Sequence, residues 1–555
     1  MFDWEQANSS EGRTFTRRLG PTEAFYWDSQ FDRAADSLQF VEAESTGSES
    51  HSVSLFDIEN VRRTWKQVKK VYPLLSARAF AGPDNIGIFF QLTEKRLWEV
   101  GPEEIHISTV NSSEEARYFA HSLITTERQL SDHLLARLYV LRHLNHPNKA
   151  HVIFHAAHCV TDGTSNNIFL STFLELLSSS SQNEEWNLEH QLAFAIPCEH
   201  RMPTYQLPLP RRRWKYAMGQ VISSLRSQKL SGGHTLPRKF TKMTPYTPAS
   251  SGSEVVELSP ETSVIVVRNC KKLGMTFGNV YPVLAQVAFG RLLCKRYVAG
   301  HIGEDEWDYR RKEPMVHSGP LNMRPYLSKL RDRTGFAGIG VAVCYYFYTL
   351  PFMPLGSASR LKLGDPVPSF SELLSFDRFL LRARSIRQQA VNYINHPLFL
   401  DIARAQTFRR LEQSKHIALR WQSGIEVNSE ELTAKVPVQE QACEGYVMAH
   451  GGSSFGNMDA IIAQNYPRKA KEGSPLRIKL LDVGVILHSK SDQLYLGAAT
   501  LKQRLCVHSF WDRNVYSDAV VTEWLEEVKS AIEHYLGSEI GDCPNLYWPS
   551  SGSRL

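Results

Sequence analysis

One segment of the 555-residue chain combines residue types that could catalyse a proton transfer. Residues 151–165 read HVIFHAAHCVTDGTS, so an apolar strand runs directly into a turn and then into a helix. Side chains at such a junction usually face a cleft and not the core. Because the imidazole of His158 titrates near neutral pH, it can take a proton from a hydroxyl or amine that attacks a carbonyl group. General-base help of this kind contributes roughly 10²–10⁴-fold to a rate.

Asp162 and Gly163 follow this histidine closely. The carboxylate can turn the loop and brace it through an ion pair, and the spacing admits both a direct His158–Asp162 pair and an Asp162 that faces away. A purely structural interpretation stays open beside the chemical one. A histidine in an apolar context is usually a hydrogen-bonded core residue, and an Asp-Gly pair is usually only a turn.

Other reactive residue types in the same segment point to no further chemistry. His155 and His158 are three residues apart, which on a strand puts them on opposite faces, so we expect no metal here. Cys159 could be a nucleophile, but a buried, inert cysteine is the commoner state. The eight cysteines are scattered singly without a CxxC spacing, which suits a reducing compartment. Gly-Xaa-Ser-Xaa-Gly, P-loop and HExxH motifs are absent.

Composition excludes several classes of protein. With 42% hydrophobic and 22% charged residues, the chain can bury a large core and is not disordered as a whole. Its 63 lysines and arginines against 58 acidic residues leave a net charge of only +5. This charge is too small for the cationic field of a nucleic-acid binder, so we expect no nucleic-acid partner.

Targeting signals favour a cytoplasmic protein. The N-terminus, MFDWEQAN, is polar and acidic, and no signal-peptide apolar run follows. Residues 334–359 carry no charge, but they include Pro351 and Pro354 and many β-branched and aromatic residues, so we expect buried strands and no membrane span. The last residues, Ser553-Arg554-Leu555, are similar to the C-terminal peroxisomal address Ser-Lys-Leu, which makes peroxisomal import the alternative location.

Hydrophobic periodicity predicts an α/β protein with two lobes. We expect residues 1–195 to form an N-terminal lobe, residues 196–254 a crossover linker without a core-forming period, and residues 255–555 a C-terminal lobe. The expected helices are 55–72, 164–177, 259–274, 279–296, 372–394 and 517–536. The expected strands are 86–92, 134–142, 151–155, 445–450, 476–488, 493–499 and 504–511.

The run HAAHCVTDGTS resembles the H-x-x-x-D-G motif of the CoA-dependent acyltransferase superfamily, to which BAHD acyltransferases, fungal trichothecene acetyltransferases and condensation domains of peptide synthetases belong. His158, Asp162 and Gly163 match this motif. The resemblance covers about residues 50–536 and leans towards fungal secondary-metabolite O-acetyltransferases. Weaker landmarks follow in the family's order: VYPLLSARAF at 71–80, LLARLYVL at 134–141, GPLNMRPYL at 319–327, GGSSFGNMD at 451–459 and RLCVHSFWDRNVYSDAVVTEWLEEV at 504–528.

The resemblance implies two similar chloramphenicol-acetyltransferase-like lobes, each a mixed sheet with flanking helices, that form a tunnel at their interface. It makes His158 the general base and places Asp162 at the catalytic motif, where its carboxylate pairs with an arginine of the second lobe. The N-x-R segment matches Arg324, so Asp162, Gly163 and Arg324 form the expected structural brace. Four residues of the 451–459 stretch are the expected substrate-binding residues: Ser453, Ser454, Gly456 and Asn457.

The activity implied is an acyl-CoA-dependent O-acyltransferase, most simply an acetyltransferase, that esterifies a hydroxyl of a natural product. Acetyl-CoA or another acyl-CoA is then a co-substrate, no cofactor is tightly bound, and the expected state is a monomer. Condensation domains carry a second histidine where this chain has Ala157, and no carrier or adenylation region is visible, which favours a diffusible donor. BAHD enzymes carry an acidic residue where this chain has Ser453-Ser454, so that loop departs from the family.

Three alternatives remain beside this interpretation. They are N-acylation, condensation with a carrier-bound donor, and a non-catalytic condensation-like module that docks a partner. The basic run Arg211-Arg-Arg-Trp-Lys215 could meet CoA phosphates or an acidic protein face, although a solvated surface patch is the simpler interpretation.

Overall fold

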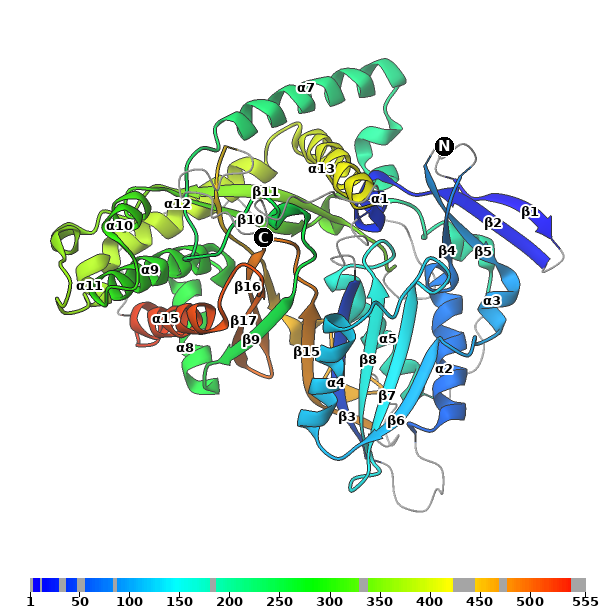
Figure 1. Cartoon of the computed structure of the whole chain (residues 1–555). Coiled ribbons are helices and arrows are strands. Elements are labelled where there is room, and N and C mark those ends of the chain that lie inside the picture. The colour runs from blue at the N-terminus through cyan, green and yellow to red at the C-terminus, as the bar shows by residue number, and fades with distance from the viewer. Residues whose placement is uncertain are drawn as a thin grey trace.

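Helices pack on mixed β-sheets throughout the chain (Figure 1). The structure is a computed structural model that describes residues 3–9, 12–28, 36–46, 55–82, 87–179, 186–328, 338–422, 445–468 and 477–540. The tripeptide Ser553-Arg554-Leu555 lies outside the described residues. The predicted α/β class is confirmed.

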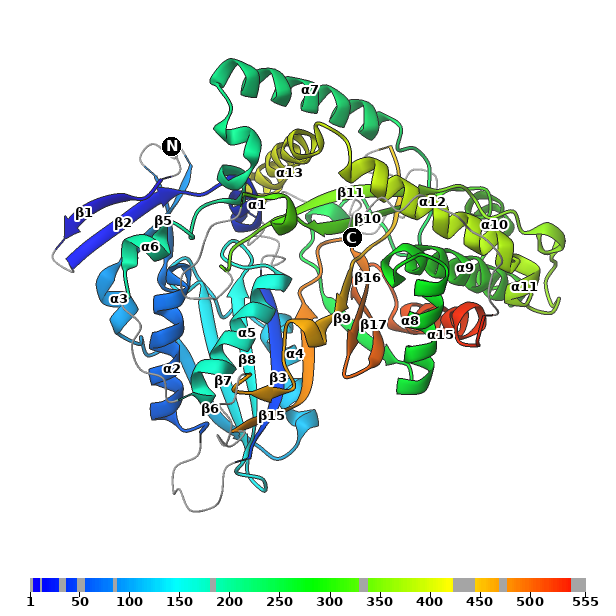
Figure 2. The same ribbon diagram turned by 180° about the vertical axis from the view of Figure 1, so that it is seen from behind.

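The first large sheet has six strands in the order β14-β15-β3-β8-β7-β6. Helices α2 and α5 bury their apolar sides against one face, and α4 covers the other face (Figures 1 and 2). Within α2, Val61, Trp65 and Val68 are fully buried, as the periodicity predicts. The elements are β3 (Asp36–Ser45), β6 (Ile105–Val110), β7 (Ala136–His143), β8 (Lys149–Ala157), β14 (Asn465–Tyr466), β15 (Ile478–Leu487), α2 (Ile58–Val71), α4 (Ser113–Thr125) and α5 (Gly163–Ser178).

The second large sheet has the order β11-β10-β12-β16-β17-β9, with β13 also paired to β16. It combines parallel pairs, such as β10 with β12, and antiparallel pairs, such as β16 with β17. Its strands are β9 (Ser251–Glu257), β10 (Met315–Asn322), β11 (Val343–Leu350), β12 (Met448–Gly451), β13 (Ser454–Asn457), β16 (Leu494–Leu501) and β17 (Arg504–Asp512).

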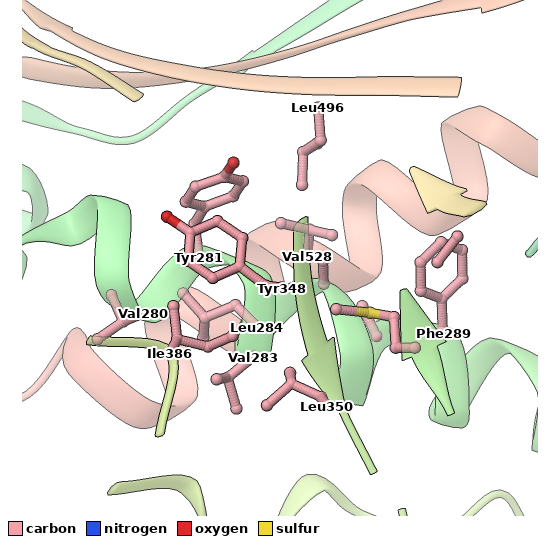
Figure 3. Close-up of a cluster of buried hydrophobic side chains, with 14 of the residues drawn as sticks. Val280, Tyr281, Val283, Leu284, Phe289, Tyr348, Leu350, Ile386, Leu496 and Val528 are labelled. Carbon is pink, nitrogen blue, oxygen red and sulfur yellow. The ribbon is translucent and has the colours of Figure 1, made fainter. Parts of the chain in front are cut away.

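Helices of the C-terminal half pack on this sheet and form a second large hydrophobic core with it. Helix α9 is apolar on nearly all sides because it lies inside that core, where Val280, Val283 and Leu284 pack near Ile386 and Val528 (Figure 3). The helices are α8 (Pro260–Lys272), α9 (Phe277–Val298), α10 (Glu304–Arg310), α11 (Phe370–Leu373), α12 (Phe376–Ile394), α13 (Phe399–Gln422) and α15 (Asp518–Leu536).

A smaller four-stranded sheet, in the order β1-β2-β5-β4, sits at the edge of the N-terminal half (Figure 1). Its strands are β1 (Glu5–Ser9), β2 (Gly12–Arg18), β4 (Arg78–Ala81) and β5 (Ile88–Thr93), and the short helices α1 (Pro21–Asp28), α3 (Glu94–Trp98) and α6 (Leu188–Leu192) lie in the same half. Of these strands, only β5 coincides with a predicted strand, because β1, β2 and β4 carry no strong alternation.

The sheets do not follow the predicted division of the chain at residues 196–254. Strand β15 pairs antiparallel with β3, so that Val483 lies opposite Val41, and β14 pairs with β15. In Figure 1 the orange β15 runs beside the blue β3. Two strands from the C-terminal half therefore complete the N-terminal sheet, and the three-part division stays a proposal about domains.

The predicted linker contains regular structure. Helix α7 (Leu209–Gln228) spans twenty of its residues and packs along α13 (Figure 1). Two small residues, Gly219 and Ser223, are the buried ones on α7, which explains why no apolar period marks the helix in the sequence. The basic run 211–215 lies in the first turns of α7, and Arg211, Arg213 and Trp214 are exposed there.

Two further expectations need correction. The predicted helix 372–394 is interrupted, because Leu374 is extended and Ser375 starts a new helix, α12. Residues 338–359, the described part of the uncharged segment, contain one strand, β11, followed by a proline-containing loop. Among the described residues, every helix is too short or too polar to cross a bilayer.

The close approach of α7 to α13 gives a test of this corrected region. A Cβ on Gly219 would lie 2.7 Å from the backbone carbonyl carbon and oxygen of Asp401. Although alanine is the better helix former by up to about 1 kcal/mol, we expect Gly219→Ala to lower the free energy of unfolding by about 1–3 kcal/mol through overpacking. Urea unfolding measures this change. The exposed Gln220→Ala on the same helix is the control, and a Gly219→Ala protein as stable as that control would contradict the packing.

Candidate active site

His158 lies in the turn that joins β8 to α5, at the interface between the two large sheets. Strand β8 is a buried strand of the first large sheet, between β3 and β7. The turn follows its C-terminal end. Helix α5 then begins at Gly163, with Asp162 as its N-cap: one carboxylate oxygen accepts a hydrogen bond from the Ser165 backbone N–H at 2.9 Å. The cap fixes where the turn ends and the helix begins, which fixes the position of His158.

A bidentate ion pair joins this turn to the C-terminal half. Arg324, just after β10, donates from Nη1 to Asp162 Oδ2 at 2.9 Å and from Nη2 to Asp162 Oδ1 at 3.0 Å. The Asp162 side chain is 1% exposed and the Arg324 side chain 18% exposed. The structure therefore brings together the two residues that the resemblance paired.

Ser165 and the chain before β11 complete the network. Arg324 Nη2 also donates to Ser165 Oγ and to the Gly340 carbonyl, both at 2.7 Å. The Ala342 backbone N–H donates to Asp162 Oδ2 at 2.9 Å. Every oxygen of the Asp162 carboxylate is thus occupied by two donors, as a buried charge requires.

These contacts decide between the two arrangements that the spacing admits. No hydrogen bond or ion pair among the described residues joins Asp162 to His158, so the carboxylate faces away and towards Arg324. Burial raises the pKa of the Asp162 carboxyl, but Arg324 and the two backbone donors outweigh it and hold that pKa below its usual value. Asp162 is consequently an anion at neutral pH.

The ring of His158 is half-buried and neutral. Burial lowers its pKa below the ordinary 6.5, against a smaller opposite effect of the Asp162 charge. Nδ1 is buried and makes no hydrogen bond to a described residue. A base with a depressed pKa stays unprotonated at pH 7 and is ready to accept a proton there.

A tyrosine that sequence reasoning missed holds the imidazole in place. The ring of Tyr26, in α1, stacks on His158 with centroids 3.7 Å apart and planes 3° from parallel. The Tyr26 hydroxyl is hydrogen-bonded to that of Tyr345, on β11, at 2.5 Å, and the Arg410 guanidinium lies over the Tyr345 ring at 3.5 Å. No local pattern marks Tyr26, since a tyrosine in a short helix has many structural roles.

The 451–459 stretch reaches the motif through residues other than those predicted. Phe455 packs so closely on Gly163 that a Cβ there would come within 2.9 Å of its ring, which explains the glycine after Asp162. Ser453 donates to or accepts from the Tyr495 hydroxyl at 2.7 Å, and Asn457 caps the short turn that follows it. Ser453, Ser454, Gly456 and Asn457 are absent from the walls of the cavities described next, so substrate contact by these four stays a proposal.

A cavity of about 500 Å³ opens beside the motif helix, between the two large sheets. Its wall is mainly apolar and includes Phe40, Phe455 and Met458, with Gln39 and Asn167 as polar groups. Several charged groups also line it: Glu114, Arg117, Glu254, Glu257 and Asp482.

A second cavity of about 380 Å³ lies on the side of Tyr345 and Phe25. Four cationic side chains line it: Arg238, Arg409, Arg410 and Lys490. One of them, Arg238, is paired with Asp492, another residue of the wall. His158 lines neither cavity: the apolar cavity reaches Asn167 of α5 and Phe455, and the cationic cavity reaches Tyr345, the hydrogen-bond partner of Tyr26.

The other reactive groups of the segment are inert. Cys159 is buried, and burial raises the pKa of its thiol far above the ordinary value, so it stays protonated. His155 is 1% exposed, and burial lowers its pKa to about 4. Among the described residues, Cys159, Cys198, Cys270, Cys294, Cys344 and Cys506 are free thiols.

Known structures share this architecture. Trichothecene 15-O-acetyltransferase TRI3 from Fusarium sporotrichioides superimposes with a TM-score of 0.67 at 12% identity, over 96% of this chain and 98% of that chain. The condensation domain of the monacolin K polyketide synthase MokA gives 0.55 at 10% identity, over 94% and 97%. A mutant of the starter condensation domain of rhizomide synthetase, in complex with C8-CoA, gives 0.56 at 9% identity, over 94% of each chain.

Sequence comparisons give no match, either to a protein-family model or to a curated protein. The structural neighbours nevertheless cover nearly the whole chain. The chain therefore has the fold of TRI3 and of the condensation domains, as the H-x-x-x-D-G resemblance implies.

The Asp162–Arg324 pair predicts a loss of stability when either charge is removed. We expect Asp162→Asn and Arg324→Met each to lower the free energy of unfolding by about 3–5 kcal/mol, because each leaves a buried charge unpaired. Urea unfolding at pH 7 measures both. The exposed ion pair Arg268–Glu539 supplies the control, since Arg268→Met should cost no more than about 1 kcal/mol. If Asp162→Asn and Arg324→Met were each as stable as the Arg268→Met control, the structural role of the Asp162–Arg324 pair would be contradicted.

The depressed pKa of Asp162 adds a pH dependence to this prediction. Stability from a carboxylate whose folded pKa is lowered is present above its unfolded pKa, about 3.9, and is lost as the pH falls through the lower folded value. The wild type should therefore lose this share of its stability below about pH 4, whereas Asp162→Asn should show a shallower acid limb. Equal acid limbs would show that Asp162 titrates as in the unfolded chain.

Proposed function

We propose that this protein is an acyl-CoA-dependent O-acyltransferase, most simply an acetyltransferase, that esterifies a hydroxyl of a small natural product. The observation that carries the proposal is a neutral histidine, His158, in a turn that the Asp162–Arg324 ion pair clamps between the two halves of the chain. The neighbours support acyl transfer as the reaction class, since they include an acetyltransferase, condensation domains and a complex with an acyl-CoA.

His158 acts as the general base in this mechanism. The acceptor hydroxyl attacks the carbonyl carbon of the thioester while its proton passes to Nε2, because Nδ1 is buried against the protein. The tetrahedral intermediate then collapses, its C–S bond breaks, and the imidazolium returns the proton to the CoA thiolate. The ester and free CoA are the products, and His158 is neutral again.

Tyr26 and the ion pair assist without touching the reacting bonds. Stacking against Tyr26 keeps the imidazole in one orientation, which keeps Nε2 aligned with the hydroxyl. Asp162 and Arg324 are positioning residues, since they hold the turn and the two lobes in register. The role of Asp162 is therefore structural in this proposal.

We assign the donor to the cationic cavity. Coenzyme A carries three phosphate groups, and Arg409, Arg410 and Lys490 offer positive charge near the Tyr26–Tyr345 pair. Its pantetheine arm would have to pass this pair of tyrosines to present the thioester to His158. The basic run 211–215, on the exposed side of α7, is left as a surface patch.

We assign the acceptor to the apolar cavity. A volume of about 500 Å³ suits a molecule of natural-product size, and Phe40, Phe455 and Met458 favour a largely apolar skeleton. Asn167 and Gln39 are the polar groups placed to orient its hydroxyls. Substrate contact is thereby proposed for Phe455 and Met458, next to the four residues predicted in that stretch.

A carrier-bound acyl donor is the second candidate, because condensation domains are among the structural neighbours. Ala157 in place of a second histidine favours the diffusible donor. Competition between acetyl-CoA and an acetylated carrier protein in one reaction separates the two. A monomer in the cytoplasm, or in peroxisomes, completes the proposal.

Replacing the base should abolish turnover without unfolding the protein. We expect His158→Ala to lower kcat by roughly 10²–10⁴-fold in a mass-spectrometric assay with acetyl-CoA and a panel of hydroxylated natural products. Its urea midpoint should stay near that of the wild type, because His158 is half-buried and its Nδ1 bonds no described residue. Turnover within a few-fold of the wild type would contradict the assignment.

The pH profile tests the protonation state. Burial lowers the pKa of His158 below 6.5, and only the neutral ring is a base. We therefore expect kcat/KM at pH 6.5 to exceed half of its high-pH plateau, and to fall only at lower pH as the ring protonates. An inflection above pH 7 would contradict a buried, neutral His158.

The cationic cavity predicts which substrate each substitution affects. Arg409→Ala should raise KM for acetyl-CoA while leaving the KM of the acceptor unchanged, since Arg409 lines the cavity proposed for the donor and not the one proposed for the acceptor. The N-acetylcysteamine thioester of acetate, which lacks those phosphates, should react equally with wild type and variant. An unchanged KM for acetyl-CoA would move the donor out of this cavity.

A further inference from the structure

Three buried polar side chains meet at the end of the first large sheet that lies away from His158. Glu42 on β3 is directly opposite His151 on β8, and His143 lies on the neighbouring strand β7, two residues beyond Leu141, which also faces His151. All three project from the face that α4 covers. Leu38, Leu141 and Ile153, which lie an even number of residues away on the same strands and so share their face, form the core against that helix. Their exposed fractions are 8% for Glu42, 5% for His143 and 1% for His151.

The spacing of these groups matches the ligands of one metal ion. Each residue presents a ligand atom within 4.8 Å of the other two. His143 Nε2 and His151 Nδ1 are hydrogen-bonded at 3.2 Å, and Glu42 Oε2 lies 3.8 Å from the other ring nitrogen of His151, Nε2. Two nitrogens that each lie about 2.0–2.1 Å from a tetrahedrally coordinated ion are separated by about 3.3 Å. The imidazole pair is near that separation, and an ion between the two nitrogens would replace the hydrogen bond that now joins them.

The buried polar atoms of this cluster have few hydrogen-bond partners among the described residues. His151 Nε2 is buried and bonds no described residue. The carboxylate of Glu42 accepts one hydrogen bond, from Ser113 Oγ at 2.8 Å.

Three basic side chains act electrostatically on the cluster, Lys149 on His143, Arg117 on His151 and Lys502 on Glu42, and the last two are hydrogen-bonded elsewhere. Arg117 donates to Asp482 at 2.7 Å, and Lys502 Nζ donates to the Leu481 carbonyl. A carboxylate that is nine-tenths buried beside two imidazoles is stabilised by a cation placed among them.

We propose that Glu42, His143 and His151 bind one divalent transition-metal cation of the zinc type. A site with two imidazole nitrogens and one carboxylate favours such ions over Mg²⁺ or Ca²⁺, which prefer oxygen ligands alone. The cluster adjoins the exposed loop 144–148, which gives the ion a route from solvent. The site is separate from the segment around His155 and His158, where the sequence predicts no metal.

The role of this ion is structural. His151 precedes Ala157, the last residue of β8 before the turn that carries His158, by six residues, a separation of about 20 Å at 3.3 Å per residue. An ion at that distance takes no part in acyl transfer, but it ties β3, β7 and β8 together. Because it binds the folded sheet only, it should raise the temperature of unfolding.

Metal binding by the full chain tests the proposal directly. Protein freed of metal by chelation is titrated with ZnCl₂ by calorimetry, and with CoCl₂ by visible absorption, because cobalt reports a nitrogen- and oxygen-ligated site. We expect one tight equivalent and a rise in the unfolding temperature. Absence of a saturable equivalent in the folded wild type, by both ions, would overturn the proposal.

Matched substitutions locate the equivalent. His143→Gln, His151→Gln and Glu42→Gln should each weaken zinc binding by more than about 100-fold, since losing a supporting residue alone costs 10–100-fold. His155→Gln is the control, because His155 is equally buried on the same strand and both its ring nitrogens lack partners among the described residues. If His143→Gln binds as tightly as His155→Gln, the ion sits elsewhere and the proposal fails. Should one variant not fold, the remaining two and the wild-type titration decide.

Discussion

The ion pair between Asp162 and Arg324 is the interaction on which the proposed site depends. It joins the N-cap of α5, in the N-terminal half, to the segment after β10, in the C-terminal half. Taking two charges out of water is costly, and this pair offsets the cost with two guanidinium hydrogen bonds and two backbone donors. The ion pair fixes the position of the turn that carries His158, because residues from both halves of the chain contact Asp162.

Several other contacts cross the same interface and act in the same direction. Strand β15 extends the N-terminal sheet, the Tyr26–Tyr345 hydrogen bond links α1 to β11, and Phe455 packs on Gly163. The two cavities lie where these contacts leave space, one lined mainly by apolar groups and one by four cationic side chains. An acyl transfer that needs two different substrates to meet at one base is consistent with this arrangement. The proposed metal cluster belongs to a different part of the sheet and would affect only its rigidity.

Local patterns predicted what local interactions determine. The strand, turn and helix around His158 follow from an apolar run, an N-cap aspartate and the period of α5, and the motif resemblance paired Asp162 with Arg324. The β3–β15 pairing joins residues more than 430 positions apart, so no window of sequence contains it. Helix α7 escaped detection because it contacts α13 through Gly219 and Ser223 and not through large apolar side chains. Tyr26, Phe455 and the Glu42–His143–His151 cluster become visible only once distant strands and helices are placed together.

The central claim, that Asp162 positions His158 through Arg324 and does not act on the ring itself, is tested most directly by measuring kcat/KM for the double variant. Replacing both partners of a buried pair leaves no unpaired charge and is often close to neutral, whereas removing one is not. The Asp162→Asn, Arg324→Met protein should therefore be more active and more stable than either single variant. If Asp162 were a direct catalytic partner of His158, adding Arg324→Met to Asp162→Asn would restore no activity, and that result would contradict the account.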